Sequence, residues 1–288
     1  MKKYLKLMRV HHYIKNLLVF AALACSGQLF DVKKLTSAAV GFLSFCMISS
    51  VIYIINDIRD REKDKNHPTK CKRPIASGSI SVKTAAVLAV LLFCISWICN
   101  YLVFDVVSTL LLFLYFILNV AYSFGLKNIP IIDVTILVSG FLIRILYGAI
   151  ITDISLSKWM YLTVAVISFY FAFGKRRNEA NQIETKGSTR TVLKYYPTGF
   201  LNRYMTMCLT LANAFYALWC MDDNTISLYN SRYLVFTVPV VLLITMMYGL
   251  NIEKDSDGDP VEVLLHDKIL LFLCITYLAL MFTILYIL

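Results

Sequence analysis

Long, continuous apolar runs constrain this chain more than any other feature of its sequence. The chain is 59% hydrophobic and only 16% charged, whereas soluble domains average about 45–50% and about 25%. A soluble fold of 288 residues cannot bury that much apolar surface, and continuous rather than alternating runs argue against a β-barrel. A spanning helix needs about 17–25 mostly apolar residues. The sequence therefore predicts an all-α, polytopic membrane bundle of nine transmembrane helices, at 14–30, 36–56, 83–104, 106–125, 131–151, 158–174, 201–221, 232–250 and 268–287.

The lysines and arginines predict how this bundle is oriented. With nine spans, 23 of the 28 Lys and Arg residues lie on the side of the N-terminus, four lie on the other side, and Arg144 lies within a span. Because basic loops stay cytoplasmic, we expect a cytoplasmic N-terminus and an external C-terminus in the cell (inner) membrane. The segment Met1–Lys15 is expected to form an amphipathic helix on the membrane surface.

The net charge of +10 indicates the kind of partner. In a soluble protein it would suggest nucleic acid, but here the charges lie between apolar runs and favour anionic lipids or phosphate-bearing substrates, not nucleic acid. We expect one integral-membrane domain over residues 1–288 with two long cytoplasmic loops, at about 57–82 and 175–200. The loops stand four spans apart, which suggests two related halves with the site where these loops meet. A homo-oligomer is compatible with the sequence.

The first loop begins with clustered oxygen ligands. Asn56, Asp60 and Asp64 are spaced i, i+4 and i+8, with Asp57 beside them, so on one continuous helix they share a face. Carboxylates gathered in this way suit Mg²⁺, which bridges a few of them to substrate phosphates. A solvated helix end balanced by neighbouring arginines and lysines is the alternative. Lys70 and Arg73 follow and are candidates for holding phosphate.

The pattern N-D-x-x-D-x-x-x-D from Asn56, followed by R-P-x-x-S-G from Arg73, resembles the UbiA superfamily of intramembrane transferases. The resemblance covers essentially the whole chain. It implies an all-helical bundle with two four-helix halves plus one helix, and aspartate motifs that bind a diphosphate substrate through Mg²⁺. Asp57, Asp60 and Asp64 would be the metal ligands, with Asn56 orienting the site.

The second loop departs from the usual prenyltransferases of that superfamily, which carry a second aspartate-rich motif there. This chain has Lys175, Arg176 and Arg177, then Glu179, and further on Lys186 to Arg190. Three consecutive cations suit bare phosphate better than a second Mg²⁺. The alternative is that they anchor the sixth helix by the positive-inside rule.

The basic run is similar to that of one branch, the decaprenyl-phosphate phosphoribosyltransferases. Other segments resemble the same branch: the N-terminal Arg9 to Asn16, the stretch from Tyr122 through Lys127, the stretch from Asp133 to Arg144, and the tail Gly258–Glu262 with Asp267. Val10 and Tyr13 depart from the branch's Pro and Trp.

Arg144 is notable apart from any family, because an arginine well inside a span is costly and normally faces a polar cavity. It lies 11 residues after Asp133, about 16 Å along one helix, so a direct pair between them is not expected. A substrate phosphate is the alternative partner.

These features together predict a Mg²⁺-dependent enzyme that transfers 5-phosphoribose from phosphoribosyl pyrophosphate to a polyprenyl (decaprenyl-type) phosphate at the cytoplasmic membrane face. The donor's phosphates would contact Lys175, Arg176 and Arg177, with Glu179 orienting Lys175 or helping to hold the metal. Lys15, Lys127 and Arg144 are candidates for either phosphate. Prenyl transfer from a prenyl diphosphate to a small acceptor is one alternative. A transporter of phosphorylated metabolites is another.

Overall fold

The computed structural model describes residues 2–67, 70–181, 191–253, 263–264 and 266–288. These residues form helices joined by loops, and none of them lies in a β-strand. The chain divides into two compact units: unit 1 comprises Met1–Leu126 and Ile143–Ser155, and unit 2 comprises Lys127–Leu142 and Leu156–Leu288. The all-α class predicted from the sequence is confirmed.

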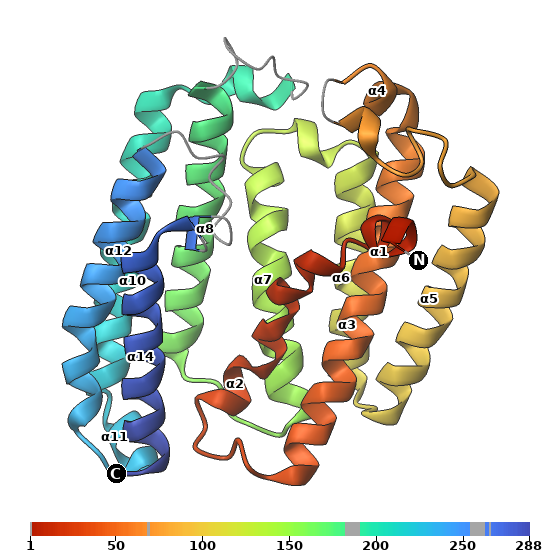
Figure 1. The fold of residues 1–288 in the computed structure, drawn as a ribbon. Helices are drawn as coiled ribbons and strands as arrows, with labels where there is room; N and C mark the ends of the chain where they lie inside the picture. Colours follow the sequence, from red (N-terminus) through yellow and green to blue (C-terminus); the bar gives the residue numbers. More distant parts are fainter. Residues whose placement is uncertain (1, 68–69, 182–190, 254–262, 265) are drawn as a thin grey trace. The chain divides into compact units, whose positions relative to one another are not determined.

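Unit 1 holds the N-terminal elements, coloured red through yellow in Figure 1, and the second half of α7, coloured green. In chain order they are α1 (Lys2–Met8), η1 (Val10–Phe20), α2 (Ala21–Ala24), α3 (Val32–Arg59), α4 (Arg61–Lys65), η2 (Lys70–Lys72), α5 (Val82–Leu102), α6 (Val106–Phe124) and the second half of α7 (Ile132–Ile151).

The centre of unit 1 is α3, which packs against α5, α6 and η1. Ser44 of α3 and Ser96 of α5 each donate a hydroxyl hydrogen bond to the other's backbone carbonyl at 2.9 Å. Small residues of this kind let membrane helices approach closely. Asp31, Ser81 and Asp105 cap the N-termini of α3, α5 and α6, so each helix begins where a side chain satisfies its first amide groups.

The N-terminal segment differs from the prediction. The first helix ends at Met8, Arg9 has a left-handed backbone (φ 52), and a 3-10 helix, η1, replaces the predicted amphipathic helix to Lys15 and much of the first span. Runs of 3-10 helix beyond three or four residues are uncommon, so tertiary contacts must hold this one. Gly148 of α7 provides such a contact, because a Cβ there would overlap the carbonyl oxygen of Val19.

Unit 2 contains the remaining elements, coloured green to blue in Figure 1 after the first half of α7. They are α8 (Lys158–Asn181), η4 (Thr191–Tyr195), α10 (Thr198–Met221), α11 (Asp223–Tyr229), η5 (Tyr233–Thr237), α12 (Val238–Glu253) and α14 (Lys268–Tyr286). The antiparallel helices α8 and α10 make its most extensive contact. Its largest core cluster combines Phe173 of α8, Met205 of α10 and Tyr248 of α12 with residues of α7 and α14.

Seven helices of the described part are long and apolar enough to cross a membrane, compared with nine predicted spans. The predicted first span is η1 with the four-residue α2. The predicted sixth span is a full-length helix, α8, but it continues into a polar run that ends at Asn181. The chain is therefore a multi-pass membrane protein with the predicted class of fold and a different N-terminal element.

Candidate active site

Two aspartates of the first polar loop converge on arginines in unit 1. Asp57 is only 3% exposed, and Nη2 of Arg9 lies 2.6 Å from its Oδ1. Nη1 of Arg73 lies 3.2 Å from the same oxygen and 2.6 Å from Oδ2 of Asp64. One guanidinium nitrogen therefore bridges two of the three aspartates of the predicted motif.

The third aspartate interrupts the helix, which corrects the expectation of one continuous face. The helix α3 ends at Arg59, Asp60 leaves helical geometry (φ −85, ψ 5), and α4 begins at the next residue. The amide of Asp60 still bonds the carbonyl of Asn56 at 2.9 Å, and that of Asp64 bonds Asp60 at 2.8 Å. These two bonds carry the helical hydrogen-bond pattern across the break between α3 and α4. Asn56 and Asp60 are half-buried, and Asp64 is buried.

This pair of carboxylates fits Mg²⁺ that also binds substrate phosphates, rather than a metal cage built by the protein alone. Within the described ranges, no group of three or more His, Cys, Asp or Glu lies close enough to hold a metal ion. Mg²⁺ commonly uses one or two carboxylates and completes its shell with phosphate oxygens and water. Nη1 of Arg73 contacts both Asp57 and Asp64, so the two carboxylates are close enough to share one cationic group.

A tight turn after Arg73 explains the R-P-x-x-S-G pattern. The carbonyl of Pro74 accepts hydrogen bonds from the Ile80 amide at 3.0 Å and the Ser79 hydroxyl at 2.9 Å. Gly78 has φ +75 there, a conformation that side chains rarely adopt. The turn buries Ile75, 1% exposed, in the core of unit 1 and so fixes Arg73 beside α3.

Arg144 lies in a buried polar network of unit 1. It is 7% exposed, its Nε donates to Asn16 Oδ1 at 2.7 Å, and its Nη2 donates to the Tyr115 hydroxyl at 2.7 Å. The guanidinium carbon also lies 4.7 Å from the centroid of the Tyr115 ring, a cation–π contact. The guanidinium of Arg144 thus has polar partners within unit 1, and its contact with Asn16 ties η1 to α7.

Arg176 of the second loop is enclosed in unit 2. Its side chain and that of Asp133 are both 0% exposed, and Arg176 Nε lies 2.7 Å from Asp133 Oδ2. Nη1 of Arg176 lies 2.8 Å from Glu179. The cationic partner of Asp133 is therefore Arg176 on α8. This agrees with the expectation that Asp133 does not pair directly with Arg144.

Tyr196 completes this buried cluster. Its hydroxyl donates to Asp133 Oδ1 at 2.5 Å and accepts the amide of Ile131 at 2.6 Å. Burial, together with the adjacent Asp133 carboxylate, raises the pKa of Tyr196, so the hydroxyl keeps its proton and remains a donor. Ile131 has φ 69, a strained conformation for a β-branched residue, and the bond from its amide to Tyr196 helps to hold it there.

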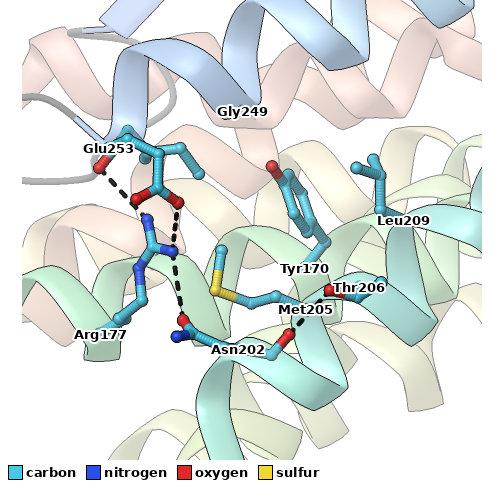
Figure 2. A pocket seen from close by; sticks show the side chains of 9 residues that line it. Tyr170, Arg177, Asn202, Met205, Thr206, Leu209, Gly249 and Glu253 are labelled. Carbon is cyan, nitrogen blue, oxygen red and sulfur yellow. Dashed lines mark hydrogen bonds and ion pairs between the residues drawn. The ribbon is translucent and has the colours of Figure 1, made fainter. Parts of the chain in front are cut away.

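Arg177 borders a pocket of about 280 Å³ in unit 2 (Figure 2). Its Nη1 lies 2.6 Å from Glu253 Oε1 and 3.2 Å from Asn202 Oδ1. Figure 2 shows this polar group on one side of the pocket, Met205 in the middle, and Tyr170, Thr206 and Leu209 on the other side. The pocket therefore has one charged side and one uncharged side that mixes apolar and hydroxyl groups.

The predicted cations thus have different surroundings. Arg176 and Arg177 are buried against carboxylates, whereas Lys175, on the same turn of α8, is half-buried. Three consecutive helical residues point about 100° apart, which accounts for the difference. The other predicted lysines are also half-buried: Lys15 in η1, Lys70 in η2 and Lys127 in η3 (Leu126–Asn128). The motif segments Lys186 to Arg190 and Gly258 to Glu262 lie outside the described residues.

Comparison with known proteins decides the family. The profile of the UbiA prenyltransferase family matches residues 17–265 of the chain. The chain belongs to the UbiA prenyltransferase family. Its resemblance extends to curated UbiA relatives named decaprenyl-phosphate phosphoribosyltransferase. The protein of Corynebacterium glutamicum is 34% identical over 95% of this chain and 83% of its own length, and that of Mycolicibacterium smegmatis is 34% identical over 96% and 90%.

Solved UbiA structures share the fold. A UbiA homolog from Archaeoglobus fulgidus, bound to GPP and Mg²⁺, has a TM-score of 0.75, covers 98% of this chain and 99% of its own, and is 18% identical. The predicted family is confirmed, and two structures of the Archaeoglobus fulgidus homolog contain Mg²⁺ together with a ligand, GPP or DMAPP.

Sequence reasoning missed four residues that organise three polar groups of this UbiA protein: Arg9 beside Asp57, Asn16 beside Arg144, and Asp133 with Tyr196 beside Arg176. Arg9, Asn16 and Asp133 lie in the two segments, Arg9 to Asn16 and Asp133 to Arg144, that resemble the family. That resemblance is the sequence signal that could have identified them as site residues. Tyr196 follows a 3-10 turn in a loop, and one tyrosine among 18 gives no signal of its own.

Proposed function

We propose that this UbiA protein transfers 5-phosphoribose from phosphoribosyl pyrophosphate to a polyprenyl phosphate of the decaprenyl type, with Mg²⁺, at the cytoplasmic membrane face. The observation that carries the proposal is the similarity, along almost the entire chain, to relatives named for decaprenyl phosphate and phosphoribosyl transfer. The basic run Lys175 to Arg177 of α8 also supports the proposal. It occupies the position at which ordinary prenyltransferases of the UbiA superfamily carry carboxylates.

In unit 1, Asp57 and Asp64 would hold Mg²⁺, with Asp60 as a further ligand and Asn56 orienting the group. When bound, the metal would neutralise charge that develops on the departing pyrophosphate. Arg73 is already directed at both carboxylates at 3.2 and 2.6 Å, so it would meet phosphate oxygens held beside them. Lys70, on the same loop, would add a second cation for the donor.

In unit 2, Lys175 would contact donor phosphate directly, since it is the half-buried member of the basic run. Arg177 would contribute to donor binding by exchanging its bond to Glu253, whose side chain is 66% exposed, for a phosphate oxygen. Arg176 would act mainly by fixing the end of α8 through Asp133 and Glu179. Lys15, Lys127 and Arg144 remain candidates for either the donor's or the acceptor's phosphate.

The proposed reaction breaks the bond between ribose C1 and the pyrophosphate oxygen and forms a bond between C1 and an oxygen of the acceptor phosphate. Pyrophosphate leaves with the electron pair of the broken bond. The acceptor is already an anion, so no strong general base is required. This agrees with the site's composition, in which carboxylates and arginines form ion pairs with one another.

The test is product formation by the purified protein in detergent, with phosphoribosyl pyrophosphate and decaprenyl phosphate. We expect a Mg²⁺-dependent phosphoribosylated lipid. Product from a prenyl diphosphate and an aromatic acceptor, with none from these substrates, would instead favour prenyl transfer. Donor binding without any lipid product would favour the transporter.

The proposed orientation has its own test. Single cysteines replacing Lys65 and Lys33, in a background in which all eight native cysteines are replaced by serine, would be labelled by a membrane-impermeant thiol reagent on intact cells. We expect Lys33→Cys to react from outside and Lys65→Cys to react only after the cells are opened. The opposite pattern would invert the topology.

A further inference from the structure

The two arginines on Asp57 neutralise the carboxylates that the motif supplies. Arg9 contributes one cation to Asp57 at 2.6 Å, and Arg73 is shared between Asp57 and Asp64. The carboxylate side chains are 3% and 6% exposed, so solvent screens these charges weakly. Two guanidinium groups and two carboxylates cancel within this hydrogen-bonded set.

Arg9 is held in place by more than its ion pair. Its backbone is left-handed (φ 52, ψ 49) at the junction of α1 and η1, a conformation that persists only where surrounding structure enforces it. Its guanidinium carbon lies 4.7 Å from the centroid of the Tyr53 ring. Tyr53 stands one helical turn before Asp57 on α3, so an aromatic face and a carboxylate on one side of that helix together clasp the guanidinium.

We infer that Arg9, with Arg73, is a positioning residue that keeps the divalent cation from binding Asp57 and Asp64 alone, so that the metal enters this site together with a diphosphate. A dication gains little from a cluster whose charges already cancel. A diphosphate adds several negative charges and offers the guanidinium groups bidentate acceptors. With it present, the same arginines would favour the metal–diphosphate pair over either ion alone.

The inference rests on the metal-binding role proposed for these aspartates, but it does not depend on which group is transferred. Its test therefore uses Mn²⁺ as the metal and inorganic pyrophosphate as the anion, without ribose or lipid. Mn²⁺ binding to the purified full-length protein is measured by electron paramagnetic resonance, with and without pyrophosphate. A protein that fails this test and still makes phosphoribosyl lipid would refute the inference and leave the proposed function intact.

We expect the unsubstituted protein to bind Mn²⁺ weakly alone and at least about tenfold more tightly with pyrophosphate. Arg9→Gln should tighten binding of Mn²⁺ alone about tenfold, because one unit charge beside a partly buried site is removed, and should reduce the gain from pyrophosphate. Arg9→Lys should restore the original behaviour. Arg59→Gln is the matched control: Arg59 ends the same helix but contacts the Phe124 ring, and its removal should change Mn²⁺ affinity by less than about twofold.

Folding of each variant is checked by circular dichroism and gel filtration. If Arg9→Gln does not fold, Arg73→Gln is the second variant, because it removes the other cation that pairs with Asp57. It should also tighten the binding of Mn²⁺ alone. Unchanged or weaker Mn²⁺ binding in a folded arginine variant would overturn the inference. An equal increase in the affinity of Arg59→Gln for Mn²⁺ would also overturn the inference. Such an increase would show that the overall charge of the protein, rather than the position of Arg9, sets the affinity.

Discussion

Each unit of the molecule contains an arginine–aspartate cluster, and the two clusters differ in their access to solvent. In unit 1, the side chains of Arg9 and Arg73 are 19% and 25% exposed while they bind Asp57. In unit 2, Arg176 and Asp133 are both 0% exposed. The first cluster is open on the arginine side, whereas the second is closed on both sides.

This difference in exposure suits the same kind of ion pair to two different roles. A closed pair has already lost its hydration, and removing one partner leaves an uncompensated buried charge. An open pair can exchange a carboxylate for a phosphate oxygen, because water and ligands reach the guanidinium. The difference supports the proposed roles: substrate chemistry for the cluster of unit 1 and support of α8 for the cluster of unit 2.

The largest expected effect is on catalysis in the open cluster. Asp57→Ala, Asp60→Ala and Asp64→Ala should each lower lipid product formation by more than about a hundredfold, since each would remove a proposed metal ligand. Glu62→Ala is the control, because Glu62 is an exposed residue of the same loop paired with Lys65 at 3.0 Å. Full activity of all three aspartate variants at saturating Mg²⁺ would remove the metal assignment.

The closed cluster should respond in stability. Arg176→Ala should lower the free energy of unfolding by about 3–5 kcal/mol, the usual cost of breaking a buried ion pair, as measured by thermal unfolding in detergent. Arg203→Ala, which removes an exposed arginine of α10, should have little effect. An Arg176 variant with unchanged stability and greatly reduced donor affinity would reverse the roles given to the clusters.

A smaller effect is expected at Lys175, the half-buried neighbour of the closed cluster. Hydrogen bonds to charged groups contribute about 1.5–3 kcal/mol, so Lys175→Ala should raise the KM for phosphoribosyl pyrophosphate by one to two orders of magnitude. The KM for the lipid should change much less. Lys194→Ala, at an exposed lysine of unit 2, is the control. If substituting Lys175, Arg176 and Arg177 together leaves donor affinity unchanged, the run is only a topological anchor.

The smallest effect should follow loss of the Tyr196 hydroxyl. Tyr196→Phe removes the donor to Asp133 and the acceptor for the Ile131 amide. Leaving buried polar groups unsatisfied costs about 1–3 kcal/mol, so thermal stability should fall by less than in Arg176→Ala. A larger loss than in Arg176→Ala would show that the tyrosine, not the ion pair, holds the closed cluster.

Local patterns predicted much of this molecule, and long-range contacts account for the rest. Apolar runs located seven membrane helices, and motif spacing brought Asp57 and Asp64 together. The break at Asp60 was not predictable, because spacing assumes a continuous helix. The direction of Arg176 depends on Asp133, 43 positions earlier in the chain. The 3-10 form of η1 depends on Asn16 and Gly148, whose partners lie more than a hundred positions away.

The most direct test of the account is to follow both halves of the donor at once. Phosphoribosyl pyrophosphate labelled with one isotope in the ribose and another in the β-phosphate of the pyrophosphate would be incubated with protein, Mg²⁺ and decaprenyl phosphate. The account predicts ribose label in the lipid fraction and an equal molar amount of β-phosphate label in free pyrophosphate. Retention of both labels in intact donor, while the same protein consumes a prenyl diphosphate, would contradict it.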